Sequence, residues 1–348
     1  MLDFKAVTSI TEIPKFEKKY VTNITKSLKA QLTALEILTN LASLEEDGDL
    51  VESDEDFDDN DDGFSSDMED GNEIEASSEV KLFTEFFAKS NMLSKVLEST
   101  VSLPTDVKMT LLGNESGKMI YSLHEKLLID SYLCLSNITE IMTLPQLGGG
   151  ESIKNIWMNL CSILCSKPDN LDLVDALSSC VRSLTNHVCH QDAGVSLENV
   201  GVNDLEQLVT VFSSYNTEKS SNTRTNIVNI LGNFVCVAAR NITDQQCIVI
   251  VTKLSSWILD VVLQDASLRV ALEGLDKLMD VFSEDDTDHV FANLNLLRKL
   301  QQISSLLKSR IKKERKSLAD EDLAVASTVK LNLQRFIGYK EKRLKQVS

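Results

Sequence analysis

Apolar residues recur every three or four positions through most of this 348-residue chain. The segment LRVALEGLDKLMDVF (268–282) is typical, because Ala271, Leu275, Leu278 and Phe282 form one stripe at helical spacing. Further leucines and a methionine widen this stripe enough to pack against two neighbouring helices. The polar SEDDTD that follows is expected to end the helix.

The C-terminal part predicts two more long helices. The first covers 290–311, where Val290, Leu294, Leu297, Leu300, Ile303, Leu307 and Ile311 step by three or four. The second is expected to begin near Asp320 as an N-cap, with Glu321 and Asp322 in the first turn, where the helix dipole favours acids. Its predicted buried face comprises Leu323, Ala326, Val329, Leu333 and Phe336.

A short leucine–asparagine signature recurs late in the apolar helices. Its asparagines are Asn40, Asn137, Asn186 and Asn233, so the spacings are about 97, 49 and 47 residues. The first spacing is about twice the others, as expected if one repeat and an insertion lie between. HEAT and armadillo repeats have about 40–47 residues. With strand patterns scarce, the sequence predicts an all-α, HEAT/armadillo-like solenoid of stacked helical hairpins.

One segment interrupts this helical pattern. Residues 45–79, here called the acidic tract, contain 18 Asp or Glu and no Lys or Arg. The other 313 residues carry 35 of the 53 acids and all 35 bases, so the net charge of −18 is a local property. Repulsion and few apolar residues predict a disordered acidic insertion. We therefore expect an N-terminal helical segment (1–44), the tract (45–79) and HEAT-like repeats (80–348).

The composition narrows the class of protein. Seven cysteines without framework spacing favour reduced thiols in the cytoplasm or nucleus. No signal peptide is recognised, and the most apolar run (247–263) is interrupted by Lys253 and shorter than the ~20 residues that span a bilayer. We expect neither membrane nor cofactor.

No catalytic constellation is recognised, so an enzyme is the least expected class. GNESGK (113–118) is one residue too short for a phosphate-binding loop, and Met119 replaces the Ser or Thr. A loop between helices explains it better. The pair Cys161 and Cys165, followed by His187, Cys189 and His190, lacks the C-x-x-C spacing of zinc knuckles. These cysteines are interpreted as small apolar residues, and no metal is expected.

Two features of the helical part allow more than one interpretation. The repeated amides Asn137, Asn186 and Asn233 either satisfy backbone groups within the repeats or line a groove that holds an extended peptide. The basic run KSRIKKERK (308–316) is a solvated helix end, a localisation or nucleic-acid signal, or a latch for the acidic tract. Direct nucleic-acid binding is the weaker alternative, since no aromatics are interleaved with these bases.

The acidic tract itself is either an entropic spacer or a segment that captures a basic partner. Phe57, Phe64, Met68 and Ile74 lie among its carboxylates, and apolar anchors of this kind suit folding on a basic partner. Phosphorylation of Ser53 or Ser66, which precede acids, would add charge.

Several segments carry a family resemblance. The ending VKLNLQRFIGYKEKRLK (329–345), with ALEGLDKLMDVFSEDD (271–286) before it, resembles the C-terminus of the HEAT repeat-containing protein 3, or symportin, family. QLTALEILTNLAS (31–43) is similar to the repeat that precedes a long acidic loop in that family, and CLSNI (134–138) to the repeat after it.

The resemblance implies a non-catalytic chaperone and nuclear import adaptor. Symportins hold the two ribosomal proteins that accompany 5S ribosomal RNA and escort them into the nucleus with an import receptor. The cargo-binding residues would then lie in the acidic loop, namely Asp54, Glu55, Asp56, Phe57, Asp58, Asp59, Asp61, Asp62, Phe64, Asp67, Met68, Glu69 and Asp70. Localisation to both cytoplasm and nucleus follows.

The sequence departs from the family in its N-terminal part. The N-terminal armadillo repeats and the Pro-Tyr import signal of the family have no counterpart, which suggests a shortened form, a partial gene model or a divergent relative. Two other classes stay open: a HEAT-repeat scaffold for an enzyme or other complex, in which the tract would matter little, and an acidic histone chaperone.

Overall fold

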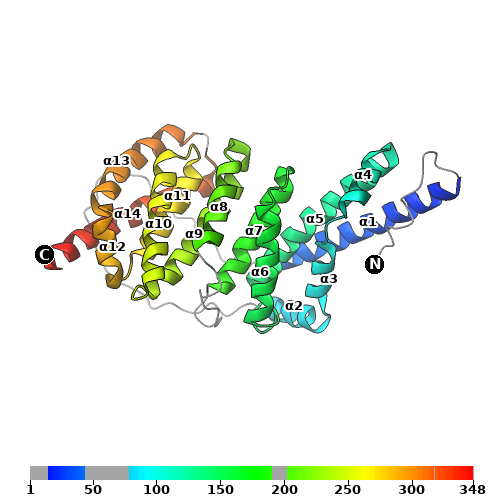
Figure 1. Ribbon diagram of the computed structural model, residues 1–348, viewed down its shortest axis with the longest axis horizontal. Helices are drawn as coiled ribbons and strands as arrows, with labels where there is room; N and C mark the ends of the chain where they lie inside the picture. Colours follow the sequence, from blue (N-terminus) through cyan, green and yellow to red (C-terminus); the bar gives the residue numbers. More distant parts are fainter. Residues whose placement is uncertain (1–14, 44–77, 190–201, 317, 348) are drawn as a thin grey trace.

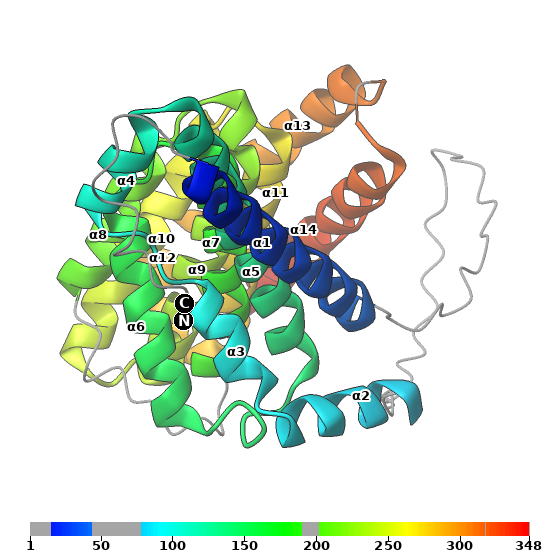
Figure 2. The ribbon, with the colours of Figure 1, turned by 90° about the vertical axis from the view of Figure 1, so that its right-hand side faces the viewer.

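The computed structural model describes residues 15–43, 78–189, 202–316 and 318–347, and the described residues form helices without strands. The helices form two layers in an elongated stack (Figures 1 and 2). The inner layer comprises α1 (Lys15–Ala42), α5 (Glu115–Ile141), α7 (Leu171–Val188), α9 (Ser221–Arg240), α11 (Leu268–Val281) and α14 (Asp320–Val347). The outer layer comprises α2 (Ser78–Lys89), α3 (Met92–Ser99), α4 (Thr105–Leu112), α6 (Gly150–Cys165), α8 (Val202–Ser214), α10 (Gln245–Gln264), α12 (Asp288–Asn293) and α13 (Leu296–Glu314).

The inner helices pack in chain order, α1 on α5, α5 on α7, α7 on α9, α9 on α11 and α11 on α14. Polar side chains begin several of the helices. Asn114 begins α5 by accepting a hydrogen bond from the Gly117 amide (2.7 Å), and Asp244 begins α10 in the same way with the Gln246 amide (2.6 Å). A continuous apolar core runs between the layers. The solenoid predicted from the sequence is therefore confirmed.

The repeat length can be measured from contacts between neighbouring repeats. Ser136 and Ser183, Asn186 and Asn233, and Asn222 and Arg269 are hydrogen-bonded pairs, and each pair is 47 residues apart. This is the spacing of the recurrent asparagines, so the repeat inferred from sequence is confirmed. It also places α1 in the same stack, because α1 packs on α5 as the next inner helix does.

The helix boundaries confirm some predictions and correct others. The helix predicted at 268–282 is α11. The helix predicted at 290–311 is wrong as a single element, because Asn295 has a left-handed backbone (φ 53°) that separates α12 from α13. Asp320 is the first residue of α14 rather than its cap, because the Leu323 amide already bonds to the Ala319 carbonyl (3.0 Å).

The predicted buried face of α14 is confirmed in its middle. Ala326, Val329 and Leu333 are buried, whereas Leu323 and Phe336 are half-buried. The last two residues predicted for the acidic tract, Ser78 and Glu79, instead form the first turn of α2.

The apolar run at 247–263 lies within α10, whose 20 residues extend beyond the run at both ends. Within the described residues, α10 is the one helix long and apolar enough, by length and composition, to cross a membrane. However, α10 packs on both α9 and α11, and nine of its side chains are buried. Its apolar composition is thus accounted for by its place in the core.

Candidate functional site: a polar face on the inner helices

The inner helices carry polar side chains at intervals of four and three residues. We call the following set the inner polar face: Asp130, Asn137 and Glu140 on α5; Asp175, Ser179, Arg182 and Asn186 on α7; Asn222, Asn226, Asn229 and Asn233 on α9; Arg269, Glu273, Asp276 and Asp280 on α11. Since intervals of four and three return to one side of a helix, each helix contributes one polar stripe. The stripes lie side by side because their helices do.

Hydrogen bonds join these stripes across the repeats. The Asn222 amide donates to Asp175 (3.3 Å) and accepts from Arg269 (2.9 Å), so one side chain connects three successive inner helices. The Asn226 amide donates to Ser179 (3.0 Å) on α7. These bonds hold the polar groups in fixed positions, which makes the face a preorganised surface rather than a set of mobile side chains.

The structure places all three predicted groove amides on this face. Asn186 is exposed, and Asn137 and Asn233 are half-buried. Asn233 donates to Asn186 (2.8 Å) and to Asn229 (3.1 Å), and Asn137 donates to Ser43 (2.6 Å). Their amide groups thus already bond to other repeats. Their use in holding a peptide stays a prediction, while the structural interpretation accounts for the contacts observed.

The inner polar face is richer than the sequence signature indicated. Asn222, Asn226 and Asn229 precede Asn233 on α9 at spacings of four, three and four, and only Asn233 was singled out. The helical spacing of four asparagines was the signal that could have revealed this stripe. Asn229 donates to Glu273 on α11 (2.6 Å), which continues the ladder past the last predicted amide.

Half-buried carboxyl groups lie at two places on this surface. On α11, burial and the neighbouring Asp280 and Glu273 raise the pKa of Asp276 against the opposing effect of Lys277. On α5, burial raises the pKa of Asp130. A carboxyl group with a raised pKa would gain from a positively charged partner. These positions therefore suit a basic ligand better than an acidic one.

The predicted cargo-binding residues of the acidic tract, from Asp54 to Asp70, lie outside the described residues. The described residues on either side of the tract nevertheless show where it is joined to the stack. Ser43, just after α1, accepts the hydrogen bond from Asn137 (2.6 Å), and α2 begins at Ser78. The tract is therefore joined to the stack beside the first amide of the inner polar face.

The segment 113–118 has a structural role. Gly113 ends α4, Asn114 caps α5, and the preceding element is a helix. A Cβ atom on Gly117 would lie 2.1 Å from the Leu111 carbonyl oxygen, so this glycine permits the close approach of α4 to α5. A phosphate-binding loop would instead follow a strand.

The cysteine and histidine cluster does not form a metal centre in the described part of the chain, which excludes His190. Burial raises the pKa of Cys161 and, to a lesser extent, that of Cys165, which opposes the thiolate form that zinc requires. His187 bonds through Nε2 to the Thr139 carbonyl on the neighbouring inner helix. These side chains therefore serve packing between repeats.

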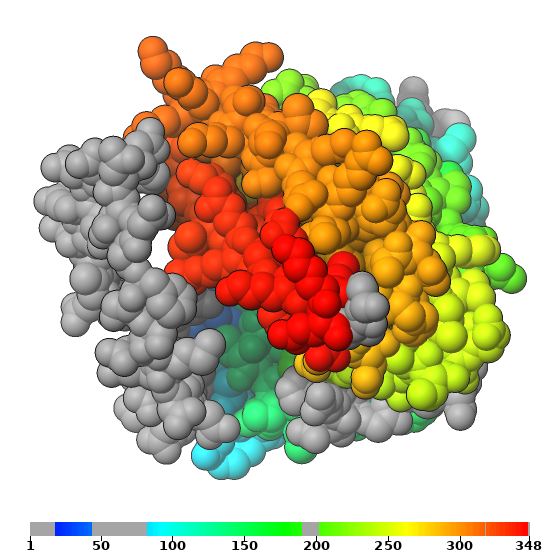
Figure 3. Space-filling view, turned by 90° about the vertical axis from the view of Figure 1, so that its left-hand side faces the viewer, coloured from blue at the N-terminus to red at the C-terminus, as the bar shows by residue number. Residues whose placement is uncertain are grey.

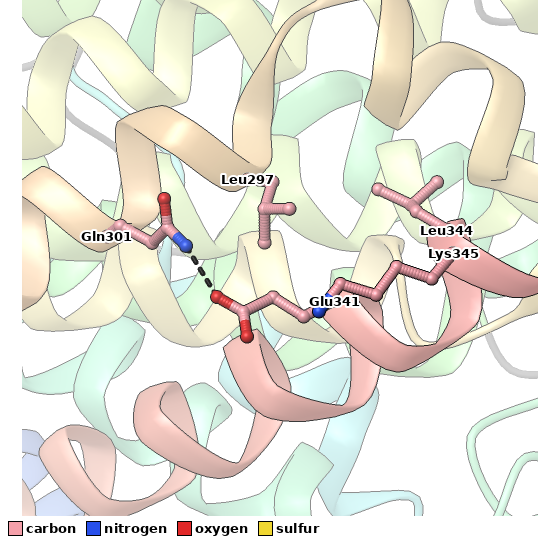
Figure 4. Close-up of a pocket in the computed structure, with 5 residues that line it drawn as sticks. All are labelled: Leu297, Gln301, Glu341, Leu344 and Lys345. Atoms are coloured by element: carbon pink, nitrogen blue, oxygen red, sulfur yellow. Dashed lines mark hydrogen bonds between the residues drawn. The ribbon is translucent and has the colours of Figure 1, made fainter. Parts of the chain in front are cut away.

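The C-terminal end of the stack is covered by α13 and α14 (Figure 3). Within the basic run, Arg310 bonds to the Asp265 carbonyl (3.1 Å), whereas Lys308, Lys312 and Lys313 are exposed. Between the two helices lies a groove of about 500 Å³, lined by Leu297, Gln301, Glu341, Leu344 and Lys345 (Figure 4). Gln301 donates to Glu341 across it (2.5 Å).

Comparison with known protein families shows to which family this chain belongs. The model of the family described as SYO1-like, TPR repeats, matches residues 81–344, which is about three quarters of the chain. The chain belongs to the SYO1-like family. The family resemblance inferred from the C-terminal motif is therefore confirmed.

Two curated relatives of this SYO1-like chain carry the name HEAT repeat-containing protein 3. The human protein is 27% identical over 328 residues, covering 90% of this chain and 46% of the human protein. The mouse protein is 28% identical over 323 residues, with the same coverages of 90% and 46%. The chain thus spans about half the length of these relatives.

The SYO1-like repeats of this chain are closer to HEAT or armadillo repeats than to tetratricopeptide repeats in length. Tetratricopeptide repeats have about 34 residues, whereas HEAT and armadillo repeats have about 40–47. The separation of 47 residues between hydrogen-bonded partners lies in the second range. The name of the curated relatives agrees with this measurement.

Proposed function

We propose that this SYO1-like chain is a chaperone and nuclear import adaptor, without catalysis of its own, for the basic ribosomal proteins of the 5S particle. It acts in biogenesis of the large ribosomal subunit and moves between cytoplasm and nucleus. The acidic tract captures the cargo, and the inner polar face supports the bound segment. An import receptor joins the complex, and no nucleic acid is bound directly.

The observation that supports this proposal best is that the excess negative charge is confined to one segment of the chain. Eighteen carboxylates lie within residues 45–79, while the remaining acids and bases balance. A ribosomal protein outside the ribosome exposes the basic surface that normally binds RNA, and such a surface needs an anionic cover. The tract supplies that charge, and Phe57, Phe64 and Met68 supply apolar contacts that could become buried with it.

The attachment of the tract supports a joint role with the solenoid. Because Asn137 holds Ser43 at the end of α1, the tract emerges at one end of the inner polar face. The carboxyl groups of Asp130 and Asp276 on this face are those whose pKa is raised by burial. A basic cargo segment that leaves the tract would meet these carboxylates along the inner layer.

Calorimetric titration of purified 5S-associated ribosomal proteins, at two salt concentrations, tests the proposal. The titrations compare the intact chain, a chain lacking 45–77, and a length-matched chain with Asn and Gln in place of all acids in 45–77. We expect tight binding by the intact chain that weakens steeply with salt, since screening acts within about 8 Å at physiological ionic strength. Both altered chains should bind at least tenfold more weakly.

The length-matched chain separates charge from spacing. If it binds as well as the intact chain, the tract is a spacer, and a binding site on the helical surface replaces the proposal. Replacement of Phe57 and Phe64 by serine should weaken binding with little change in its salt dependence, because these residues contribute no charge. Competition between histones and the ribosomal proteins tests the histone chaperone alternative, which equal or tighter histone binding would favour.

A further inference from the structure

Four lysines of the basic run 308–316 have no bonding partner among the described residues. They are Lys308, Lys312, Lys313 and Lys316, and all four are exposed. By contrast, Arg310 in the same run bonds to Glu314 (2.9 Å), and Lys340 on α14 pairs with Asp288 (2.7 Å). The run therefore contains more positive charge than the fold uses, and this charge is available to a partner.

These lysines lie at the edge of the described structure. Figures 2 and 3 show the end of α13 projecting beyond its neighbours. The acids that follow in sequence, Asp320, Glu321 and Asp322, bond to none of the four lysines. Leu307 is the last buried residue of α13, and no side chain in 312–316 is buried. The last turn can therefore unwind without exposing the core, and five extended residues span up to about 17 Å.

An extended form of this segment would present a basic edge to a partner. Successive side chains of an extended chain point to opposite sides. Lys313 and Arg315 would thus face one wall of a groove with no acid between them, while Glu314 points the other way. Runs of this length and composition act as nuclear localisation signals or as contacts to nucleic acid.

An exposed leucine favours a protein over a nucleic acid as the partner. Leu306 is 62% exposed, and it lies on the same side of α13 as Lys313, seven residues later. A phosphate backbone offers no apolar surface that would bury this side chain, whereas a protein does. In addition, no aromatic residue lies within 296–319 to stack on the bases of a nucleic acid.

We propose that the basic run 308–316 is the site at which an import receptor with an acidic groove binds this chain. The inference rests on the proposed function, which requires such a receptor but gives it no position. The run lies on α13, at the opposite end of the stack from α1 and α2, which flank the acidic tract (Figure 1). Cargo on the tract and a receptor on α13 would therefore occupy separate surfaces of one chain.

Binding of the intact chain to a purified import receptor that holds lysine-rich signals in an acidic groove tests this proposal. We expect Lys312→Gln with Lys313→Gln to weaken binding at least tenfold, and an excess of a lysine-rich signal peptide to displace the intact chain. The matched control is Lys342→Gln with Lys345→Gln, which removes the same charge from exposed positions on α14. Circular dichroism checks that both variants keep their helices. Equal binding by the two variants, or no binding by the intact chain, would overturn the proposal.

The substitution Glu314→Gln tests the same site in the opposite direction. Glu314 is the only acid in 308–316, and its bond to Arg310 (2.9 Å) supports the last turn of α13. Its replacement makes the segment more basic and easier to extend, so we expect receptor binding to become about threefold tighter. Weaker binding by this variant would overturn the proposal.

Two further measurements separate this inference from the proposed function and from nucleic-acid binding. Titration with the ribosomal proteins should give the same affinity for the Lys312→Gln, Lys313→Gln variant as for the intact chain. An intact chain that binds the ribosomal proteins but not the receptor excludes only this inference, whereas one that binds the receptor but not the ribosomal proteins excludes only the proposed cargo. If the double variant loses affinity for polyuridylate RNA and keeps its affinity for the receptor, the run is a nucleic-acid site and the inference is wrong.

Discussion

At the scale of single residues, the ion pair between Arg224 and Asp265 connects α9 to the turn between α10 and α11. The side chains are 2% and 4% exposed, and two hydrogen bonds of 2.8 and 3.0 Å join them. Removal of one partner leaves a buried charge without its counterion. We expect Asp265→Ala to lower the free energy of unfolding by about 3–5 kcal/mol in urea titrations.

The control for this prediction is an exposed ion pair between neighbouring outer helices. Lys253 and Glu206 are 3.2 Å apart, and both side chains are at least half exposed. Exposed pairs contribute about 0–1 kcal/mol because water and salt screen them. Lys253→Ala should therefore change the unfolding free energy by less than about 1 kcal/mol. Similar losses in the two variants would show that burial does not distinguish the pairs.

His124 makes the stability of the stack depend on pH. It is buried on α5, and burial lowers the pKa of its imidazole below the ordinary 6.5. As the pH falls below 6.5, the unfolded chain takes up a proton that the folded chain resists, so stability falls. Urea midpoints should decrease between pH 7.5 and 5.5, and His124→Asn should flatten this dependence. Substitution of the exposed His289 by asparagine serves as control.

The sequence predicted individual residues of the inner polar face better than their contacts. Asn137, Asn186 and Asn233 were found because a leucine precedes each at a fixed distance, and the structure places all three on inner helices. That Asn233 bonds to Asn186, and Asn222 to both Asp175 and Arg269, depends on how neighbouring repeats are aligned. Helical period fixes the side of a helix but not its alignment with the next one.

At the scale of helices, two helical glycines differ in their surroundings. Gly117 lies where α5 meets α4, and a Cβ atom there would overlap the Leu111 backbone. Gly338 lies inside α14 with no atom within 4 Å of such a Cβ. We expect Gly117→Ala to destabilise the fold by about 1–3 kcal/mol through overpacking. Gly338→Ala should stabilise it by about 0.5–1 kcal/mol, because alanine favours helix.

Thermal unfolding of both variants tests this contrast directly. No loss of stability in Gly117→Ala would contradict the close packing of α4 on α5, and a loss in Gly338→Ala would contradict the open surroundings of Gly338 on α14. The pair is informative because helix propensity alone predicts a gain at both positions.

Helix breaks were the least predictable feature at this scale. The apolar positions of 290–311 keep their spacing across the boundary between α12 and α13, and the stripe has buried members on both sides of the break, Val290 in α12 and Leu300, Ile303 and Leu307 in α13. The break arises from the left-handed backbone of Asn295 (φ 53°), a conformation that asparagine adopts more readily than most residues. Hydrophobic periodicity reports which side is buried and therefore does not detect a break that preserves it.

At the scale of the whole molecule, each repeat contacts only its neighbours, and this follows from the recurrent spacing. The 47-residue spacing predicted the stack, since identical hairpins bury apolar faces only by stacking. In such a stack, stability is the sum of local terms, and damage at one end need not reach the other. The signature at Asn40 already placed α1 in the repeat array. The further repeat expected between Asn40 and Asn137 was wrong, because α1 packs directly on α5, and the 97 residues hold the acidic tract and the outer helices α2, α3 and α4 instead of another inner helix.

The C-terminal end provides the sharpest test of this local behaviour. Lys340 on α14 is fully buried and pairs with Asp288 on α12 (2.7 Å), between the rings of Phe291, Phe336 and Tyr339. Lys340→Ala removes the cation and leaves Asp288 to Arg343 alone (3.2 Å). We expect this variant to lose a buried pair worth about 3–5 kcal/mol and to release α14 from the stack.

Hydrogen exchange followed by mass spectrometry measures the loss of stability separately for each helix. Amides of α12, α13 and α14 should exchange at least tenfold faster in Lys340→Ala, while those of α5, α7 and α9 keep their protection, because α14 packs chiefly on α11 and α13. Lys345→Ala, an exposed substitution on the same helix, should leave every region unchanged. A uniform loss of protection over all helices would mean that the stack unfolds as one cooperative unit. A loss confined to α12, α13 and α14 would instead mean that the part of the stack to which the acidic tract is joined is independent of the C-terminal helices.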